Sequence, residues 1–321
     1  MKRTIHRLCI AILSLYFFST TAFAARELIP GGQVIGLELS AGSVTVAAFD
    51  DSVTTARDAG LRIGDRIVAI DGKDITCAED VRRALNVSQG SVDLLIHRGG
   101  KEITIHMEPA VTTGGPRLGV YLRQGITGIG TVTFYDPHTH TFGTLGHGVN
   151  DAKGNLLPMS RGSAYTADIV SVQKGKTGQP GQLKGALDGA QLLGDLTCNT
   201  EQGVFGKAPI HWDGKALPCA EYGQIRIGRA TIRSTVTDGD PRDYSVEILK
   251  IYPKNRSDGR NFLLKVTDPT LLSTTGGIVQ GMSGSPIIQD GKLIGAVTHV
   301  LVNDPTMGYG IFIDNMLDAA G

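Results

Sequence analysis

The run Gly281-Met282-Ser283-Gly284-Ser285-Pro286 contains the residues whose types and spacing are most typical of catalysis. A serine hydroxyl acts as a nucleophile when a sharp turn exposes it and directs backbone NH groups at the oxygen that becomes negative. Glycines beside the serine make such a turn possible. The apolar residues 287–288, a turn at 289–292 and the apolar residues 293–297 predict a strand, a tight turn and a strand. We therefore predict that Ser283 is a nucleophile.

A serine hydroxyl is unreactive at neutral pH without a base, and histidine is the leading candidate. His147 ends a predicted strand and lies between glycines that let backbone and substrate approach closely. His299 follows in the strand after the nucleophile, where we expect a packed imidazole. His138 and His140 share a strand face, but no Cys, His or carboxylate set of suitable spacing completes a metal site. We predict that His147 is the base and that no metal or cofactor is required.

Composition limits the elements that can position these residues. The chain has 321 residues, 43 of them glycine, and only 6% aromatic residues, which favours short strands and tight turns over a helical bundle. At about 150 residues per domain, this length predicts two domains. The 31 Lys and Arg balance the 31 Asp and Glu, so no basic surface for nucleic acid is indicated.

Residues 1–24 are typical of a signal peptide or an uncleaved anchor, which predicts export across the cytoplasmic membrane. An apolar stretch at 8–18 precedes the small-residue pattern Ala22-Phe23-Ala24, and the basic head consists of Lys2, Arg3 and Arg7. In an oxidising compartment Cys198 and Cys219 can form a disulfide or remain two thiols.

Residues 28–110 predict a small α+β domain, and the glycine-rich residues 111–117 predict a linker. Thr76 and Glu79 have the spacing of a capping box for a helix that ends near residue 85. The other expected elements are strands at 43–49, 66–70, 92–97 and 102–107 and a short helix at 54–59.

The run at residues 59–72, AGLRIGDRIVAIDG, closely resembles the most recognisable stretch of bacterial PDZ domains. Upstream, residues 31–37 are similar to the carboxylate-binding loop of that family. The resemblance implies that Ile35, Gly36 and Leu37 bind the C-terminus of an extended peptide through backbone NH groups and the adjoining strand edge.

Residues 118–321 are dominated by β-branched and aromatic strand patterns, which predict a barrel or a sandwich. Residues 174–181 contain glycines and a proline without periodicity, so we predict a mobile surface loop there.

The spacing around Ser283, together with the hairpin that follows it, resembles the nucleophile region of chymotrypsin-like proteases. This resemblance implies a double β-barrel in which the NH groups of Gly281 and Ser283 form the oxyanion hole.

Four stretches narrow the resemblance to the SpoIVB peptidase family, the stage IV sporulation proteases. They are residues 130–135 with 142–147, residues 199–200 with 203–206, residues 275–286, and residues 295–300 with 303–305 and 308–310. The family implies a secreted serine endopeptidase that acts between the two membranes around a forespore. It would cleave a regulator of a membrane-embedded protease that releases a sigma factor, and it would also cleave itself.

The acid that orients His147 is the least determined member of the site. Asp268 precedes Ser283 by 15 residues, and the family resemblance makes it the acid. Chymotrypsin-like enzymes usually carry the acid farther upstream, which leaves Asp151 and Asp168 as alternatives. Asp before Pro is also a common turn starter.

Two functions from different classes follow from these residues. The favoured one is a regulated serine protease whose PDZ domain presents substrate or restrains the active site. The alternative is a PDZ peptide-binding protein whose barrel is catalytically silent. The partners expected are a protein substrate and a peptide ligand, which can be a segment of the chain itself.

Overall fold

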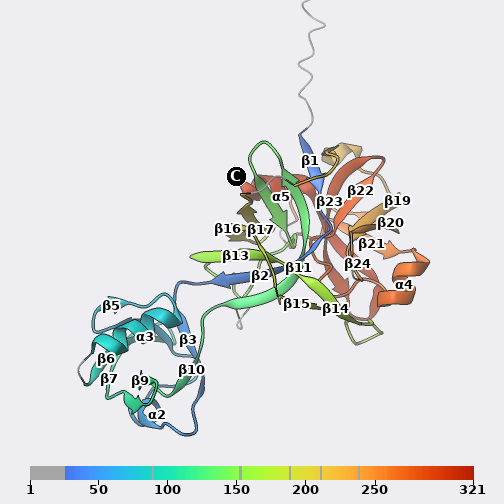
Figure 1. Cartoon of the computed structure of the whole chain (residues 1–321). Coiled ribbons are helices and arrows are strands. Elements are labelled where there is room, and N and C mark those ends of the chain that lie inside the picture. Colours follow the sequence, from blue (N-terminus) through green and yellow to red (C-terminus); the bar gives the residue numbers. More distant parts are fainter. Residues whose placement is uncertain are drawn as a thin grey trace, which may run out of the picture.

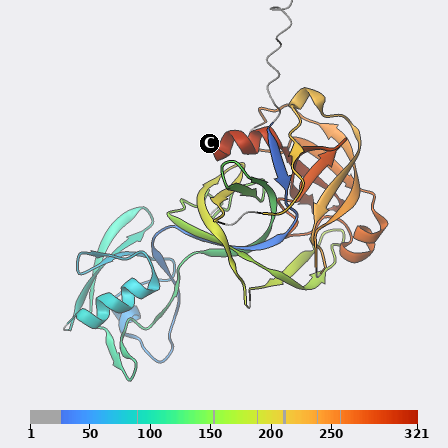
Figure 2. The same ribbon diagram turned by 45° about the horizontal axis from the view of Figure 1, so that its top comes forward.

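The computed structural model describes residues 26–321 apart from residues 89, 152, 153, 188, 210, 211, 238 and 257. The predicted signal peptide or anchor at residues 1–24 lies outside the described residues. Within the described part, no helix is both long and apolar enough to span a bilayer. Two barrels lie side by side, and a small α+β unit is set apart from them (Figure 1, Figure 2). The predicted fold class, a mainly-β double barrel with a small α+β domain, is confirmed.

The small unit is a sheet of order β10-β3-β4-β6-β7, with β5 on β4. Its own hydrophobic core draws on residues between Val44 and Leu122 only. The buried Asp65 accepts from Arg98 at 2.6 and 2.7 Å, and this ion pair lowers its pKa against the effect of burial. The elements are β3 (Val44–Phe49), α2 (Thr55–Asp58), β4 (Arg66–Ile70), β5 (Lys73–Asp74), α3 (Ala78–Val87), β6 (Val92–Arg98), β7 (Lys101–Met107), β8 (Ala110–Thr112), β9 (Gly115–Arg117) and β10 (Val120–Arg123).

Helix α3 begins one residue later than the capping-box prediction. Its N-cap is Cys77, and Asp80, not Glu79, reaches back to the amides of Thr76 and Cys77 at 3.0 and 3.2 Å. The Thr76 hydroxyl, which donates to the same carboxylate at 2.7 Å, and these amides lower the pKa of Asp80 to about 2.

The first barrel has the strand order β12-β17-β16-β13-β2-β11. It closes because β12, the first strand of this order, also pairs with β11, the last. The path continues through β1 to β18. Its strands are β1 (Glu27–Pro30), β2 (Val34–Ser40), β11 (Ile126–Asp136), β12 (Thr141–Thr144), β13 (Arg161–Thr166), β16 (Leu192–Thr200), β17 (Gly203–Lys207) and β18 (Leu217–Pro218).

The small unit is therefore an insertion in a hairpin of this barrel. Strands β2 and β11 pair antiparallel from Leu39 with Ile126 to Val34 with Thr131, and the unit occupies residues 41–125 between them. The sequence-based boundaries at residues 28 and 110 were wrong, because strands β1 and β2 belong to the barrel sheet. The predicted linker 111–117 forms the hairpin β8–β9, and β10 returns to the small unit's sheet.

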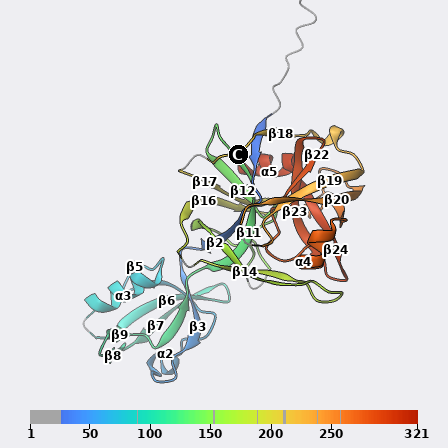
Figure 3. The same cartoon turned by 45° about the vertical axis from the view of Figure 1, so that its right-hand side comes forward.

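The second barrel has the closed order β19-β20-β21-β24-β23-β22 (Figure 3). Helix α5 packs against residues of β1, β11, β17, β23 and β24 in a separate apolar cluster. Cys198 and Cys219 lie beside this cluster as free thiols, and burial raises the pKa of Cys219 to about 12. The elements are η1 (Tyr222–Gln224), β19 (Gly228–Ser234), β20 (Arg242–Ile251), β21 (Phe262–Val266), α4 (Pro269–Thr275), β22 (Pro286–Gln289), β23 (Lys292–Leu301), β24 (Asp304–Phe312) and α5 (Ile313–Ala320).

A hairpin of β14 (Asp168–Gln173) and β15 (Gln182–Ala186) leaves the first barrel and reaches the second. The segment 174–181 within it is not the free surface loop that its composition indicated. Gly175 donates to the Thr275 carbonyl at 2.8 Å, and the Gly181 carbonyl accepts from Gln280 at 2.9 Å. The hairpin thus supports the chain just before the predicted nucleophile.

Candidate active site

Ser283 lies on the turn that precedes β22, at a cleft of about 440 Å³ between the two barrels. His147 lines the same cleft from the first barrel, so the structure brings the predicted nucleophile and base together. Among the described hydrogen bonds, Ser283 Oγ donates to the Thr298 carbonyl at 2.7 Å and none joins it to His147. Rotation about the Cα–Cβ bond of Ser283 is needed before His147 can take the proton, which is common in ligand-free sites.

The glycines around Ser283 have specific steric reasons. Gly281 has a φ of +99°, and Gly284 has a φ of +97°. A Cβ on Gly284 would lie 2.0 Å from the Thr131 carbonyl oxygen, so only glycine lets the first barrel approach this closely. The amides of Gly281 and Ser283 donate to no partner among the described residues, which leaves both available for an oxyanion.

Buried threonines of β11 hold the carbonyl groups of this turn. Thr131 Oγ1 donates to the Gly281 carbonyl at 2.7 Å, and Thr133 Oγ1 donates to the Gly284 carbonyl at 2.8 Å. The Thr131 amide donates to the Ser283 carbonyl at 2.9 Å. Because the carbonyls are bound on the barrel side, we infer that these bonds fix the peptide planes that direct the free amides. The Thr-x-Thr alternation at residues 131–133 is the sequence signal for this contact, and the sequence-based interpretation gave it no role.

His147 follows a left-handed pair, Leu145 and Gly146, with φ values of +67° and +70°. Its Nδ1 lies 2.9 Å from the Gly148 carbonyl oxygen. A carbonyl only accepts, so this contact assigns the proton to Nδ1 and leaves Nε2 as the base. Burial lowers the pKa of His147, while the Gly148 carbonyl opposes that effect. The imidazole is therefore neutral, and able to accept a proton, at pH 7.

His299 packs against this base, with 5.0 Å between the two ring centroids. Burial, the neighbouring His147 and Arg260 lower the pKa of His299 to about 4. A neutral His299 therefore adds no positive charge beside His147 at neutral pH. His140, one of the two histidines considered for a metal, instead places Nδ1 2.7 Å from the Tyr135 hydroxyl.

Asp268 does not lie at His147. It is the N-cap of α4, where Oδ1 accepts from the amides of Thr270 and Leu271 at 2.9 and 3.0 Å. Its other oxygen accepts from the Ser245 amide at 3.3 Å. Asp-Pro at the start of a helix is a favoured cap, and this local role accounts for the sequence. The interpretation of Asp268 as the orienting acid is therefore not supported by its hydrogen bonds.

The two alternative acids also have other surroundings. Asp151 accepts from the Asn155 amide at 3.0 Å in its own turn, and Asp168 begins the exposed strand β14.

Asn199 is the polar side chain that holds the segment after His147. Its Oδ1 accepts from the Val149 amide at 2.9 Å, and its Nδ2 donates to the Val149 and Leu157 carbonyls at 2.8 and 3.0 Å. Sequence analysis did not give Asn199 a role.

The peptide-binding prediction for Ile35, Gly36 and Leu37 was wrong. They lie in β2, whose two edges are paired with β11 and β13, so no edge is free for a peptide. Ile35 and Leu37 are buried in the barrel core. A Cβ on Gly36 would lie 2.3 Å from Leu187 Cδ2, which explains the glycine by packing.

The small unit presents a different edge, along β10. This strand pairs only with β3 and ends the sheet. Helix α3 flanks it: the Ala78 amide donates to Gln124 Oε1 at 2.9 Å, and Asn86 lies beside Gly115. The amides of Leu118 and Gly119, just before β10, donate to no partner in the described structure. A strand edge beside a helix, with free amides at its start, suits an extended peptide with a carboxylate end.

Comparisons with known proteins assign the family. A profile of the SpoIVB peptidase S55 family matches residues 114–317, and a PDZ domain profile matches residues 54–98. The chain belongs to the SpoIVB peptidase S55 family. It is a serine peptidase with a PDZ domain.

Other similarities are shorter or weaker. Serine protease HTRA1 of Xenopus tropicalis is 36% identical over 72 residues, 22% of this chain and 15% of that protein. The putative zinc metalloprotease Atu1380 of Agrobacterium fabrum is 38% identical over 79 residues, 24% of this chain and 21% of that protein. The chain thus matches only 15% to 21% of the length of these relatives. The crystal structure of the Rv3671c protease, inactive form, has a TM-score of 0.34 at 14% identity, covering 60% of this chain and 84% of that one.

Thr131→Val should lower kcat about tenfold with little change in KM. The change removes one buried hydroxyl, and leaving the Gly281 carbonyl without its donor costs roughly 1–3 kcal/mol, which relaxes the peptide plane beside the oxyanion. Steady-state kinetics on a peptide substrate measure this, and Thr131→Ser, which keeps the hydroxyl, is the matched control. Equal kcat for the valine and serine variants would contradict the role of this bond.

Asp268→Asn should retain most of the wild-type activity, because asparagine also caps helices and Asp268 makes no described contact with His147. Asp268→Ala should lower the free energy of unfolding by about 1 kcal/mol through loss of the cap. Activity assays and chemical unfolding separate the two effects. Loss of activity in a fully folded asparagine variant would restore Asp268 as the orienting acid.

Proposed function

We propose that this serine peptidase is an exported endopeptidase that cleaves a regulatory protein in sporulation signalling and also cleaves itself. The observation that carries the catalytic part is the cleft that Ser283, Gly281 and the neutral His147 line together, with the amides of Gly281 and Ser283 free among the described residues. Family membership supports the sporulation part, and the basic and apolar residues 1–24 support export. The proposed site of action is the space between the forespore membranes, where the substrate is a membrane-associated regulator of an intramembrane protease.

The chemistry follows from the geometry. His147 Nε2 accepts the proton of Ser283 Oγ as that oxygen attacks the substrate carbonyl. The amides of Gly281 and Ser283 stabilise the oxyanion, and His147 then donates the proton to the leaving amine. Water hydrolyses the resulting ester by the same proton transfers. The Gly148 carbonyl holds the tautomer that an acidic side chain commonly selects.

Ser283→Ala should abolish peptide hydrolysis, self-cleavage and labelling by a fluorophosphonate probe while the protein remains folded. Ser285 is the matched control, because its buried Oγ lies 3.0 Å from Ser234 Oγ inside the barrel and faces no substrate. Mass spectrometry of the labelled protein identifies the modified residue. Labelling at Ser285, or hydrolysis by folded Ser283→Ala, would remove Ser283 as the nucleophile.

We further propose that the PDZ unit binds peptides with a free C-terminus along β10. A fragment of residues 41–125 should bind an immobilised pool of random heptapeptides with free carboxylates, and C-terminal amidation should abolish the binding. A fragment of residues 28–110 lacks β10 and should not bind. If the fragment of residues 41–125 retained peptides with a free carboxylate and peptides with an amidated end equally, the proposed binding site along β10 would be wrong.

A further inference from the structure

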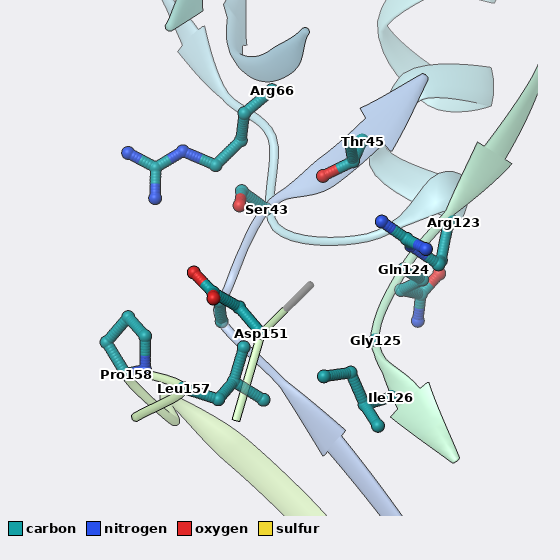
Figure 4. A pocket seen from close by; sticks show the side chains of 11 residues that line it. Ser43, Thr45, Arg66, Arg123, Gln124, Gly125, Ile126, Asp151, Leu157 and Pro158 are labelled. Atoms are coloured by element: carbon teal, nitrogen blue, oxygen red, sulfur yellow. The ribbon is translucent and has the colours of Figure 1, made fainter. Parts of the chain in front are cut away.

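A second cavity, of about 230 Å³, lies where the PDZ unit meets the first barrel (Figure 4). Arg66 in β4 and Arg123 in β10 line it from the PDZ unit. Asp151, Leu157 and Pro158 line it from the barrel, across from the two arginines (Figure 4). The PDZ side of the cavity therefore carries two cations, whereas the barrel side carries one carboxylate and two apolar side chains.

This cavity continues from the catalytic cleft. Ile126 lines both, and its partner across the β2–β11 pair, Leu39, lines the cleft. The Leu157 amide at the cavity donates to the carbonyl of Val149 in the cleft wall at 2.9 Å. A chain leaving the cleft along the first barrel therefore meets this cavity next.

The catalytic groups determine which part of a substrate leaves in that direction. The substrate carbonyl oxygen must face the amides of Gly281 and Ser283 in the second barrel. The nitrogen of the cleaved bond must face His147, which protonates it and belongs to the first barrel. Residues C-terminal to the cleaved bond therefore extend on the first-barrel side, along Ile126 toward the two arginines.

The arginines suit an acidic side chain. Arg66 Nη2 contacts His97 Nδ1, and His97 Nε2 lies 2.9 Å from Glu102 Oε1, so a chain of polar contacts orients this half-buried guanidinium. Arg123 is exposed, and its side chain makes no hydrogen bond or ion pair among the described residues. Guanidinium groups bind carboxylates through paired N–H donors.

We propose that this cavity is a substrate subsite in which Arg66 and Arg123 select acidic side chains on the C-terminal side of the cleaved bond. The proposal rests on the proposed endopeptidase function and deepens it by naming a substrate class. Asp151 on the opposite wall repels a misplaced carboxylate, so an acidic side chain is directed to the arginine side.

The test begins with denatured casein, whose cleaved bonds are located by mass spectrometry of the products. A series of fluorescence-quenched peptides is then made around one such bond. Each peptide carries one Asp at a different position after the bond, and a matched peptide carries the neutral Asn at the same position. At one or two positions Asp should raise kcat/KM about tenfold over Asn, and high salt should reduce this preference. Arg123→Glu should reverse it, favouring Lys over Asp at the same position.

The double variant Arg66→Gln, Arg123→Gln should cleave the Asp and Asn peptides with nearly equal kcat/KM. Arg82→Gln is the control, because Arg82 lies on the exposed face of α3, 3.0 Å from Glu79, and should keep the wild-type ratio. Cleavage of Asp and Asn peptides at equal rates by the wild type would overturn the subsite and leave the protease function intact. Failure to cleave casein and every peptide would overturn both.

Discussion

The contact between strand β11 of the first barrel and the Ser283 turn of the second is the constraint on which the site depends. Three carbonyls of the turn accept from Thr131 and Thr133 across the barrel interface. The turn is glycine-rich and would otherwise sample many conformations. Donors at 2.7–2.9 Å in a buried interface limit that freedom, so the oxyanion amides are oriented before substrate arrives.

The same strand joins the active site to the PDZ unit. Strand β11 follows β10 after only two residues, Gln124 and Gly125, and the Gln124 side chain contacts the start of α3. An insertion between paired strands has two covalent connections instead of one. This restricts the orientation of the PDZ unit more than a terminal linker would. The proposed peptide groove at β10 and the proposed substrate path along β11 therefore lie on neighbouring parts of one chain segment.

The base is prepared by the backbone and by burial. The Gly148 carbonyl selects the tautomer of His147, and loss of hydration keeps the imidazole neutral. Asn199 fixes the following segment with three hydrogen bonds to backbone groups. An imidazolium formed during the reaction has no described carboxylate beside it. The preorganised amides therefore carry more of the charge stabilisation than in a site with an acid.

The sequence by itself determined features that depend on neighbours along the chain. The glycine pattern around Ser283 requires a turn with positive φ, and the PDZ run specifies its own strand and turn. His147 between glycines was identified for the same local reason. The fold class followed from the resemblance and from strand patterns, because alternation and β-branched residues report that a segment is a strand.

Only the tertiary structure decided which strands pair. Residues 34–40 alternate like any half-buried strand. That pattern is the same whether the partner is β11, with Ile126 paired to Leu39, or a PDZ strand close by. Because the pattern does not identify the partner strand, the sequence placed Ile35–Leu37 in the PDZ domain and set the boundaries of that domain wrongly. Asp268 was assigned from the family resemblance, whereas its carboxylate accepts from the nearest free helix amides. Which strands pair over long distances, and which donors a carboxylate accepts from, are decided by the groups that the fold brings together.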